Sequence, residues 1–196
     1  ILGNNNISIS SLSQKECSCG DKGSASLLIL THEANEGDLK QADINEGIES
    51  TLILIKNKLD GIKIKKTLEK LPPTECNPGK INQMIMNLID NAIYAIHKKD
   101  MNNSDGVIDI FTTTDNGFVS ITIKDNGIGI PEKIKNKLFE PFFTTKDVGD
   151  GTGLGLSIVR SIIDSHNGEI KINSEINEGT ELIIKIPITK KINGEN

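Results

Sequence analysis

Two asparagines, Asn87 and Asn91, stand four positions apart within the strongest helical pattern of the chain. Side chains at this spacing lie on the same face of a helix, one turn from each other. Their carboxamide oxygens can ligate a hard cation such as Mg²⁺, which takes its other ligands from water and phosphate. An ordinary solvated helix face has the same pattern, so the spacing alone leaves both interpretations open.

A carboxylate, Asp125, ends a β-rich run and is followed by Gly127 and Gly129. Glycines allow positive φ or a close approach of the backbone to a ligand. A carboxylate at this position can accept a hydrogen bond from an exocyclic amine, and Ile128 and Ile130 can form an apolar slot for a base. The alternative is an ordinary turn, because Asp-Asn-Gly is favourable turn chemistry.

A glycine-rich run, residues 151–157 (GTGLGLS), opens a predicted helix. The free amides and the positive dipole end of a helix N-terminus suit a polyphosphate. The run is not a Walker P-loop, because no Lys-Ser or Lys-Thr follows the glycines. It is not a Rossmann fingerprint either, because it follows a long loop rather than a strand.

Three phenylalanines lie close together in the preceding loop, in residues 139–146 (FEPFFTTK). The rings either dock onto another surface or pack into a minor core. Lys146, at the end of this segment, is a flexible point charge that can contact phosphate, or else a plain surface lysine.

Periodicity and turn residues predict the elements that must position these groups. The predicted helices cover 46–59, 79–97, 132–139 and 154–166, and the predicted strands cover 62–70, 107–114, 118–125, 169–175 and 180–188. The buried face of the helix over 79–97 should consist of Ile81, Ile85, Leu88, Ala92 and either Ala95 or Ile96. Hairpin turns are expected around residues 115–117 and 177–179. The class is α/β, with a mixed sheet covered by helices on one face.

Composition excludes several other kinds of protein. The 196 residues carry a net charge of −5 and 3% aromatic residues, which argues against a nucleic-acid partner. No apolar run is long enough for a transmembrane helix. Three cysteines form no even framework, so a reduced cytoplasmic setting is expected, and Cys17 and Cys19 have no second pair at metal-ligand spacing. The start at Ile1 suggests a fragment of a longer protein.

In chain order, the helix asparagines, Asp-x-Gly-x-Gly, the Phe-rich segment and Gly-x-Gly-x-Gly follow the N, G1, F and G2 boxes. Over about residues 43–189, the chain resembles the ATP-binding catalytic domain of sensor histidine kinases, in the gyrase/heat-shock-chaperone/histidine-kinase superfamily. FEPFFTTK and GTGLGLSIV match the family nearly letter for letter. The resemblance implies a two-layer α/β sandwich of the Bergerat type, with a mixed, mostly antiparallel sheet and an ATP lid over 126–153.

The resemblance also implies roles for individual residues. Asp125 should bond the adenine amine, helped by a water near Gly129 and Thr180. Asn91 should bind Mg²⁺, and Asn87 should support the metal or the phosphates. These two asparagines and Lys146 are the expected catalytic residues. The remaining expected ATP contacts are Gly127, Ile130, Thr145, Gly151, Thr152, Gly153, Leu154, Gly155 and Leu156.

Two positions depart from the patterns of relatives. Hydrolytic relatives carry a Glu where Asn87 stands, and a carboxamide cannot act as a general base, so slow hydrolysis is expected. Such a site fits phosphoryl transfer to a histidine, where positioning and charge neutralisation dominate. Many relatives carry an aromatic residue at the position of Ala95, so Tyr94 is not assigned to adenine stacking.

The phosphoaccepting histidine is expected outside this chain. His32 superficially resembles an H-box residue, but an arm of about 40 Å needs roughly 27 helical residues. The elements predicted between His32 and Asn91 leave too little chain for the second arm. His97 and His166 lie at predicted helix ends and are expected to be structural. The chain alone should therefore show no autophosphorylation.

The expected organisation is a poorly structured lead over 1–42 with a remnant of the dimerisation hairpin, a catalytic domain over 43–190 and a tail over 191–196. The expected partners are a histidine-bearing dimerisation domain of the same protein and a downstream response regulator, without nucleic-acid or membrane contact. The alternatives are a hydrolytic ATPase of the gyrase or mismatch-repair type and a nucleotide-sensing module without activity.

Overall fold

The computed structural model describes residues 39–99, 105–146 and 151–188. The predictions for the lead up to residue 38, including Cys17, Cys19 and His32, and for the tail over 191–196 lie outside these residues. Within the described ranges, no helix is both long enough and apolar enough to cross a membrane.

The elements follow one another in an order typical of an α/β domain. In chain order they are β1 (Lys40–Ala42), α1 (Ile44–Ile55), η1 (Lys56–Lys58), β2 (Lys63–Leu68), β3 (Thr74–Cys76), α2 (Pro78–Lys98), β4 (Val107–Asp115), β5 (Phe118–Asp125), α3 (Glu132–Lys135), α4 (Gly155–Ser165), β6 (Glu169–Glu175) and β7 (Gly179–Pro187).

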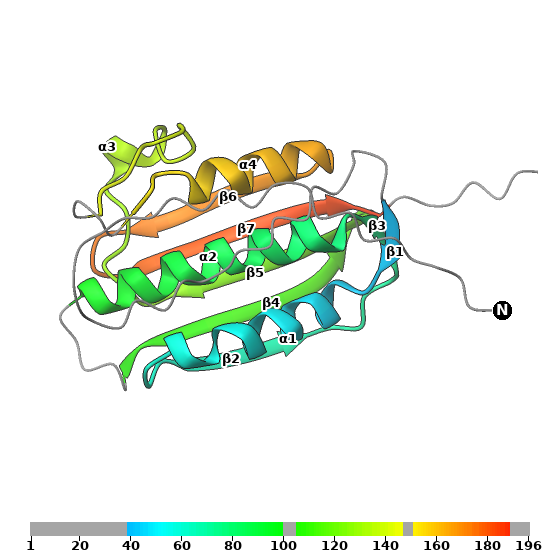
Figure 1. Ribbon diagram of the computed structural model, residues 1–196, viewed down its shortest axis with the longest axis horizontal. Coiled ribbons are helices and arrows are strands. Elements are labelled where there is room, and N and C mark those ends of the chain that lie inside the picture. The colour runs from blue at the N-terminus through cyan, green and yellow to red at the C-terminus, as the bar shows by residue number, and fades with distance from the viewer. Residues whose placement is uncertain (1–38, 100–104, 147–150, 189–196) are drawn as a thin grey trace, which may run out of the picture. The chain divides into compact units, whose positions relative to one another are not determined.

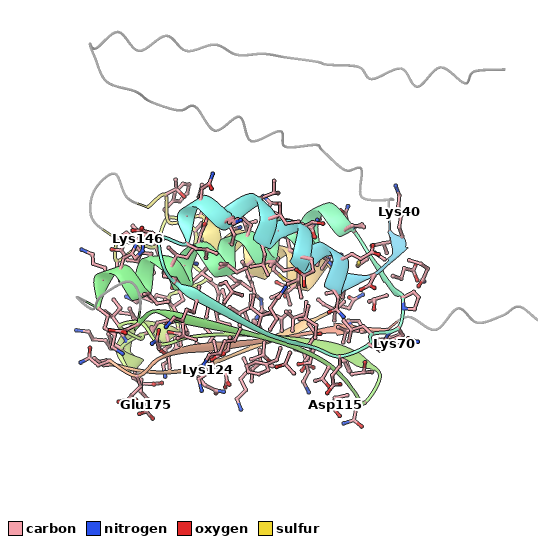
Figure 2. The ribbon with its side chains drawn as sticks, turned by 90° about the horizontal axis from the view of Figure 1, so that it is seen from below. Lys40, Lys70, Asp115, Lys124, Lys146 and Glu175 are labelled. Atoms are coloured by element: carbon pink, nitrogen blue, oxygen red, sulfur yellow. The ribbon has the colours of Figure 1, made fainter. Side chains whose placement is uncertain are left out.

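A mixed five-stranded sheet, in the order β2-β4-β5-β7-β6, forms one layer of this domain. Only the β2–β4 pair is parallel, and the other pairs are antiparallel. Helices α1, α2 and α4 form the second layer on one face of the sheet (Figure 1). Asp115, Lys124 and Glu175 point away from the helices on the other face (Figure 2). The predicted fold class is therefore confirmed.

Aliphatic side chains fill the space between the two layers. The fully buried members include Ile48, Ile85, Leu88, Ile89, Ile108, Ile110, Ile121, Ile163 and Ile184. Their alternation on the strands and their 3–4 residue spacing on the helices is the pattern that the sequence showed. Burial of this surface supplies most of the driving force for folding.

The longest helix, α2, is fixed at its start by a cap and a histidine. The Asn77 side chain accepts a hydrogen bond from Lys80 N at 3.1 Å, and Pro78 occupies the first turn. His166, at the end of α4, accepts from Asn77 N through Nε2 at 3.0 Å. Its Nδ1 lies 2.7 Å from Ile162 O, to which it donates. His166 therefore ties two helices together, as a structural residue.

Three details differ from the sequence-based expectations. Helix α1 begins at Ile44, because Asp43 Oδ1 caps it by accepting from Asn45 N at 2.8 Å, and its regular part ends at Ile55. Residues 40–42, expected in the lead, form β1 and pair with β3. Strands β1 and β3 have three residues each, which is too short to show alternation in the sequence. The buried face of α2 is as predicted, and of its two alternatives for the last position Ile96 is the buried one.

The third difference is the helix α3, which covers four residues, Glu132–Lys135, instead of 132–139. The chain then continues in tight turns, with Leu138 N donating to Lys135 O and Glu140 N to Lys137 O. Pro141, which cannot donate a backbone hydrogen bond, follows at once. The segment therefore turns back toward α2 instead of extending the helix.

Both predicted hairpins are present. Asn116 and Gly117 connect β4 to β5 with φ of 48° and 83°, as a type I′ turn requires. Asn177, with a φ of 66°, lies in the connection from β6 to β7, and Gly179, with a φ of 110°, begins β7. The second connection lies beside the loop that follows β5, since Asn177 N donates to Ile128 O at 2.8 Å.

The substitution His166→Ala should lower the free energy of unfolding by about 2 kcal/mol, because it leaves the buried Asn77 amide and the Ile162 carbonyl without this partner. Urea unfolding followed by circular dichroism measures the change. His97→Ala, at an exposed position of α2, is the matched control and should change stability little. Equal stability of the two variants would contradict the structural role of His166.

Candidate functional site

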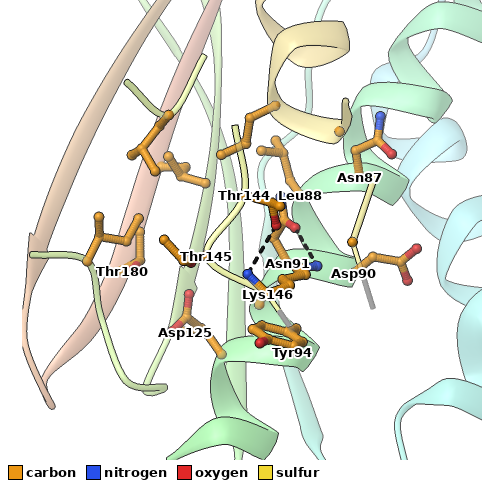
Figure 3. Close-up of a pocket in the computed structure, with 18 of the residues that line it drawn as sticks. Asn87, Leu88, Asp90, Asn91, Tyr94, Asp125, Thr144, Thr145, Lys146 and Thr180 are labelled. Atoms are coloured by element: carbon orange, nitrogen blue, oxygen red, sulfur yellow. Dashed lines mark hydrogen bonds between the residues drawn. The ribbon is translucent and has the colours of Figure 1, made fainter. Parts of the chain in front are cut away.

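A pocket of about 540 Å³ lies between α2, the loop after β5, the segment before residue 147 and the start of α4 (Figure 3). Most residues predicted for the site line it, although they come from distant parts of the sequence. These are Asn87, Asn91, Asp125, Gly129, Ile130, Thr145, Lys146, Gly151, Thr152, Gly153, Gly155, Leu156 and Thr180. Gly127 and Leu154 are outside its lining, but the Gly127 amide donates to Asp125 and Leu154 directly precedes α4.

Asp125 provides a buried acceptor in this pocket. The residue is 7% exposed, and its Oδ1 accepts from Gly127 N at 2.8 Å. Burial raises the pKa of Asp125 to about 6, while the backbone amides of Gly127 and Thr180 and the charge of Lys99 act in the opposite direction. Because burial disfavours its charged form, this carboxylate favours a ligand that donates a hydrogen bond to it.

The loop that follows Asp125 is tightly packed against its neighbours. A Cβ on Gly127 would collide with the backbone of Ala95 in α2, and Ile128 N donates to Ala95 O at 3.0 Å. Gly129 has a φ of 68°, and a Cβ there would overlap Glu175 O. Both glycines are therefore needed to bring the loop against its neighbours.

Asn126, which sequence reasoning treated only as part of a turn, holds the edge of β4. Its Oδ1 accepts from Val107 N, and its Nδ2 donates to Asp105 O, both at 2.9 Å. Lys99 Nζ donates to Asn126 O at 2.7 Å. This residue positions the loop and does not line the pocket.

A cation contacts Asn91 in this structure, namely the ammonium group of Lys146. Lys146 Nζ donates to Asn91 Oδ1 at 3.1 Å and lies 4.4 Å from the ring centroid of Tyr94 (Figure 3). The Asn91 oxygen thus faces the pocket as an acceptor for positive charge. Tyr94 was left unassigned from the sequence, although its spacing of three from Asn91 on a helix placed it on the same face.

Asn87 contributes a buried donor one turn before Asn91. Among the residues that the structure describes, its Nδ2 has no hydrogen-bond partner. Leaving such a group unpaired costs about 1–3 kcal/mol, unless a ligand supplies an acceptor. Asn87 Oδ1 lies 4.0 Å from the site of a Cβ on Gly155, so this side chain is beside the start of α4.

The N-terminus of α4 opens toward the pocket through Gly155 and Leu156. The residue before the helix, Leu154, has no side-chain cap of its own, and Thr152 Oγ1 accepts from its amide at 3.3 Å. Gly153 has a φ of 68°, and a Cβ there would overlap the backbone of Phe142. The glycine run therefore lets the helix start approach the pocket, where its dipole favours an anion.

The three clustered phenylalanines have separate environments. Phe143 lines the pocket, Phe139 is half-buried, and Phe142 is 75% exposed with a φ of 66°. Neither expectation holds for all three rings, because one ring is exposed and the other two are partly buried. Of these three clustered rings, Phe142 is the exposed one.

Ser174, on β6, was missed from the sequence. Its Oγ lies 2.9 Å from Thr180 Oγ1 and accepts from Ile130 N at 2.8 Å, and it also donates to Gly179 O at 2.8 Å. Thr180 and Ile130 both line the pocket. The serine gave no sequence signal, because its contact with Ile130 joins positions 44 residues apart and its other contacts depend on the β6–β7 pairing.

No group of three or more His, Cys, Asp or Glu side chains within the described ranges could hold a metal ion. Asp90, between the two asparagines, forms a salt bridge of 3.0 Å with Lys58 instead. A cation in this pocket would therefore depend on carboxamide oxygens and on the ligand's own oxygens, a set that suits Mg²⁺.

Residues 76–190 match the family described as "Histidine kinase-, DNA gyrase B-, and HSP90-like ATPase". Sporulation kinase A of Bacillus subtilis (strain 168) is 37% identical over 142 residues, which are 72% of this chain and 22% of that protein. The chain spans less than a third of the length of the curated relatives it matches.

Solved structures with the same architecture include the catalytic domain of histidine kinase ThkA. That domain superposes with a TM-score of 0.67 at 33% identity, covering 78% of this chain and 97% of the domain. ThkA in complex with the response regulator protein TrrA superposes with a TM-score of 0.63 at 30% identity, covering 77% of this chain and 42% of that one.

The substitution Asp125→Asn should stabilise the ligand-free protein at pH 7.5. A carboxyl whose pKa rises from 3.8 unfolded to about 6 folded favours the fold when protonated. This contribution is complete below pH 3.8 and is lost as the pH rises through 6, which amounts to about 3 kcal/mol. The neutral carboxamide avoids that loss and can still accept from Gly127 N.

Urea unfolding at several pH values measures the effect, and the gain of Asp125→Asn should shrink between pH 7.5 and 5. Asp109→Asn, on the open face of the sheet, is the matched control and should show no such trend. A constant difference between Asp125→Asn and the parent at all pH values would refute burial as the cause.

Proposed function

Because the chain belongs to the histidine kinase-, DNA gyrase B- and HSP90-like ATPase family, as a histidine kinase catalytic domain, we propose that its pocket binds ATP with Mg²⁺. The domain transfers the γ-phosphoryl group to a histidine on a dimerisation domain of the same protein. The observation that carries this proposal is the convergence of Asp125, Asn91 and Lys146 in one pocket.

The base end of the proposed site is the end that holds Asp125. An adenine amine that donates to this carboxylate compensates for the desolvation that raises its pKa. Ile123, Ile128 and Ile130 supply apolar wall on this side of the pocket. The base is therefore held by aliphatic contacts and one charged acceptor, without an aromatic stacking partner.

The phosphate end is assigned to Lys146, the start of α4 and the Asn87 amide. The helix N-terminus and the ammonium group attract the triphosphate. The unpaired Asn87 Nδ2 is a donor that a phosphate oxygen would satisfy. These groups orient the γ-phosphoryl group and stabilise the charge that develops during its transfer.

Asn91 and Asn87 would hold Mg²⁺ through their side-chain oxygens. The present structure supports this for Asn91, because its Oδ1 already accepts from the Lys146 cation. When bound, Mg²⁺ supplies neutralisation of the phosphate charge. Asn87 cannot take a proton from water, so hydrolysis is expected to be slow, which disfavours a gyrase-type ATPase cycle.

The proposed partners are the dimerisation domain and a response regulator, the kind of protein with which ThkA forms a complex. Phe142, exposed beside the glycine run, is available to contact the dimerisation domain. The proposed catalytic unit is 43–190, extended by β1, with a lid over 126–153. Because the reaction consumes ATP, the domain is expected to work in the cytoplasm.

Phosphoryl transfer to the dimerisation domain of the same protein is the direct test. Mixed with that domain and ATP, the chain should produce acid-labile phosphohistidine, whereas the chain alone should produce none. Asp125→Asn should weaken ADP binding in calorimetry by at least about ten-fold, because a charged acceptor is lost. Asp109→Asn should bind normally. Unchanged ADP affinity in Asp125→Asn would remove the basis of the pocket assignment.

The metal role of Asn91 predicts a difference between two buffers. In Mg²⁺, Asn91→Ala should bind ATP more weakly than the parent by about five- to ten-fold. In EDTA the parent and the variant should bind alike. Asp90→Ala, whose carboxylate bonds Lys58, is the control and should keep the parent's Mg²⁺ dependence. The same loss in both buffers would argue that Asn91 has no part in holding the metal.

A further inference from the structure

We propose that Ser174 is a positioning residue that orients the hydroxyl proton of Thr180 and thereby makes the pocket selective for a 6-amino purine over a 6-oxo purine. This inference rests on the proposed function, since it concerns the base end of the same nucleotide site. It adds a residue that lies behind the pocket wall and acts on the ligand only through Thr180.

The contacts of Ser174 use its full hydrogen-bonding capacity. Its Oγ lies 2.8 Å from Ile130 N, 2.8 Å from Gly179 O and 2.9 Å from Thr180 Oγ1. A serine hydroxyl has one proton to donate and two lone pairs that accept. Three partners at these distances therefore saturate the group.

The chemistry of two of these partners decides the direction of the third bond. Ile130 N can only donate, and the Gly179 carbonyl can only accept. The single proton of Ser174 is thus used on Gly179 O. Thr180 must then be the donor toward Ser174 Oγ. The proton of Thr180 consequently points away from the pocket, which Thr180 lines.

The remaining lone pairs of Thr180 make it an acceptor toward the pocket. Asp125 lies beside it, because the two are partners in the β5–β7 register, and its carboxylate also accepts (Figure 3). The base end therefore presents two acceptors together. An amine, or a water that donates to Thr180, satisfies them, whereas a 6-oxo group brings a third acceptor.

The surrounding structure holds this arrangement rigidly. Ser174 and Thr180 are themselves partners in the β6–β7 ladder, so their side chains share one face of the sheet. Thr180 is 6% exposed, and Ile130 N ties the loop after Asp125 to the same serine. Because water has little access to this hydroxyl, its proton stays in the direction that the hydrogen bond to Ser174 sets.

A purely structural role of Ser174 makes a different prediction from this one. Loss of the Ile130 bond alone would loosen the loop and weaken every nucleotide equally. Loss of the hydrogen bond from Thr180 to Ser174 would let the Thr180 proton turn into the pocket. There it opposes an amine and favours a 6-oxo group. The ratio of two affinities separates these effects, because the loop contribution cancels.

The test is calorimetric titration of the chain with ADP and with inosine diphosphate, which differ at the 6-position of the base. The parent should prefer ADP, and Ser174→Ala should reduce that preference by about five-fold or more. Ser174→Thr, which retains the hydroxyl, should restore it. Ser120→Ala, a buried serine of β5 outside the pocket lining, is the matched control and should leave the preference unchanged.

A double-mutant comparison with Thr180→Val shows whether Ser174 acts through Thr180. Thr180→Val should lower the preference for ADP by itself, and adding Ser174→Ala to it should change the preference no further. If Ser174→Ala does not fold, Ser174→Cys takes its place, because a thiol of similar size is a much weaker hydrogen-bonding group. An unchanged ADP preference in Ser174→Ala or in Thr180→Val would overturn the inference. No binding of ADP to the parent would instead contradict the proposed nucleotide site, which is a separate result.

Discussion

The packing of α2 against the central strands of the sheet is the interaction on which the site depends. One face of this helix is buried in the aliphatic core, which fixes its rotation and therefore the direction of Asn87 and Asn91. The same helix provides Ala95, whose carbonyl accepts from Ile128 N and whose backbone excludes a Cβ at Gly127. Core, pocket wall and loop support thus come from one element, so a shift of α2 would disturb all three.

The site holds polar groups whose isolation in the fold costs stability. Asp125 carries a raised pKa because it is buried, and the Asn87 amide is unpaired within the described part of the chain. Burial of the isoleucine-rich core offsets the destabilisation that these two polar groups cause. A ligand with a donor at one end and acceptors at the other would recover both. This is the physical meaning of the match between pocket and nucleotide.

Sequence patterns were sufficient where the signal is local. The period of α2, the Asn116-Gly117 turn and the glycine run before α4 each depend on neighbouring residues, and each lies where it was predicted. Patterns failed for β1, which is too short to alternate, and for Ser174 and Tyr94. The importance of these two side chains arises from contacts with Ile130 and Lys146, more than forty positions away. Only the assembled fold brings such pairs together.

The contact between Lys146 and Asn91 constrains how the proposed site can fill. Asn91 Oδ1 now accepts from an ammonium group, and the proposed function gives the same oxygen to Mg²⁺. A Mg²⁺ ion at this oxygen would repel the ammonium group, so metal binding would favour release of Lys146 from Asn91 and Tyr94. The phosphates offer the lysine a new partner of opposite charge. Because Lys146 ends the segment that carries Phe142 and Phe143, its transfer from α2 to the ligand would couple nucleotide binding to the position of that segment.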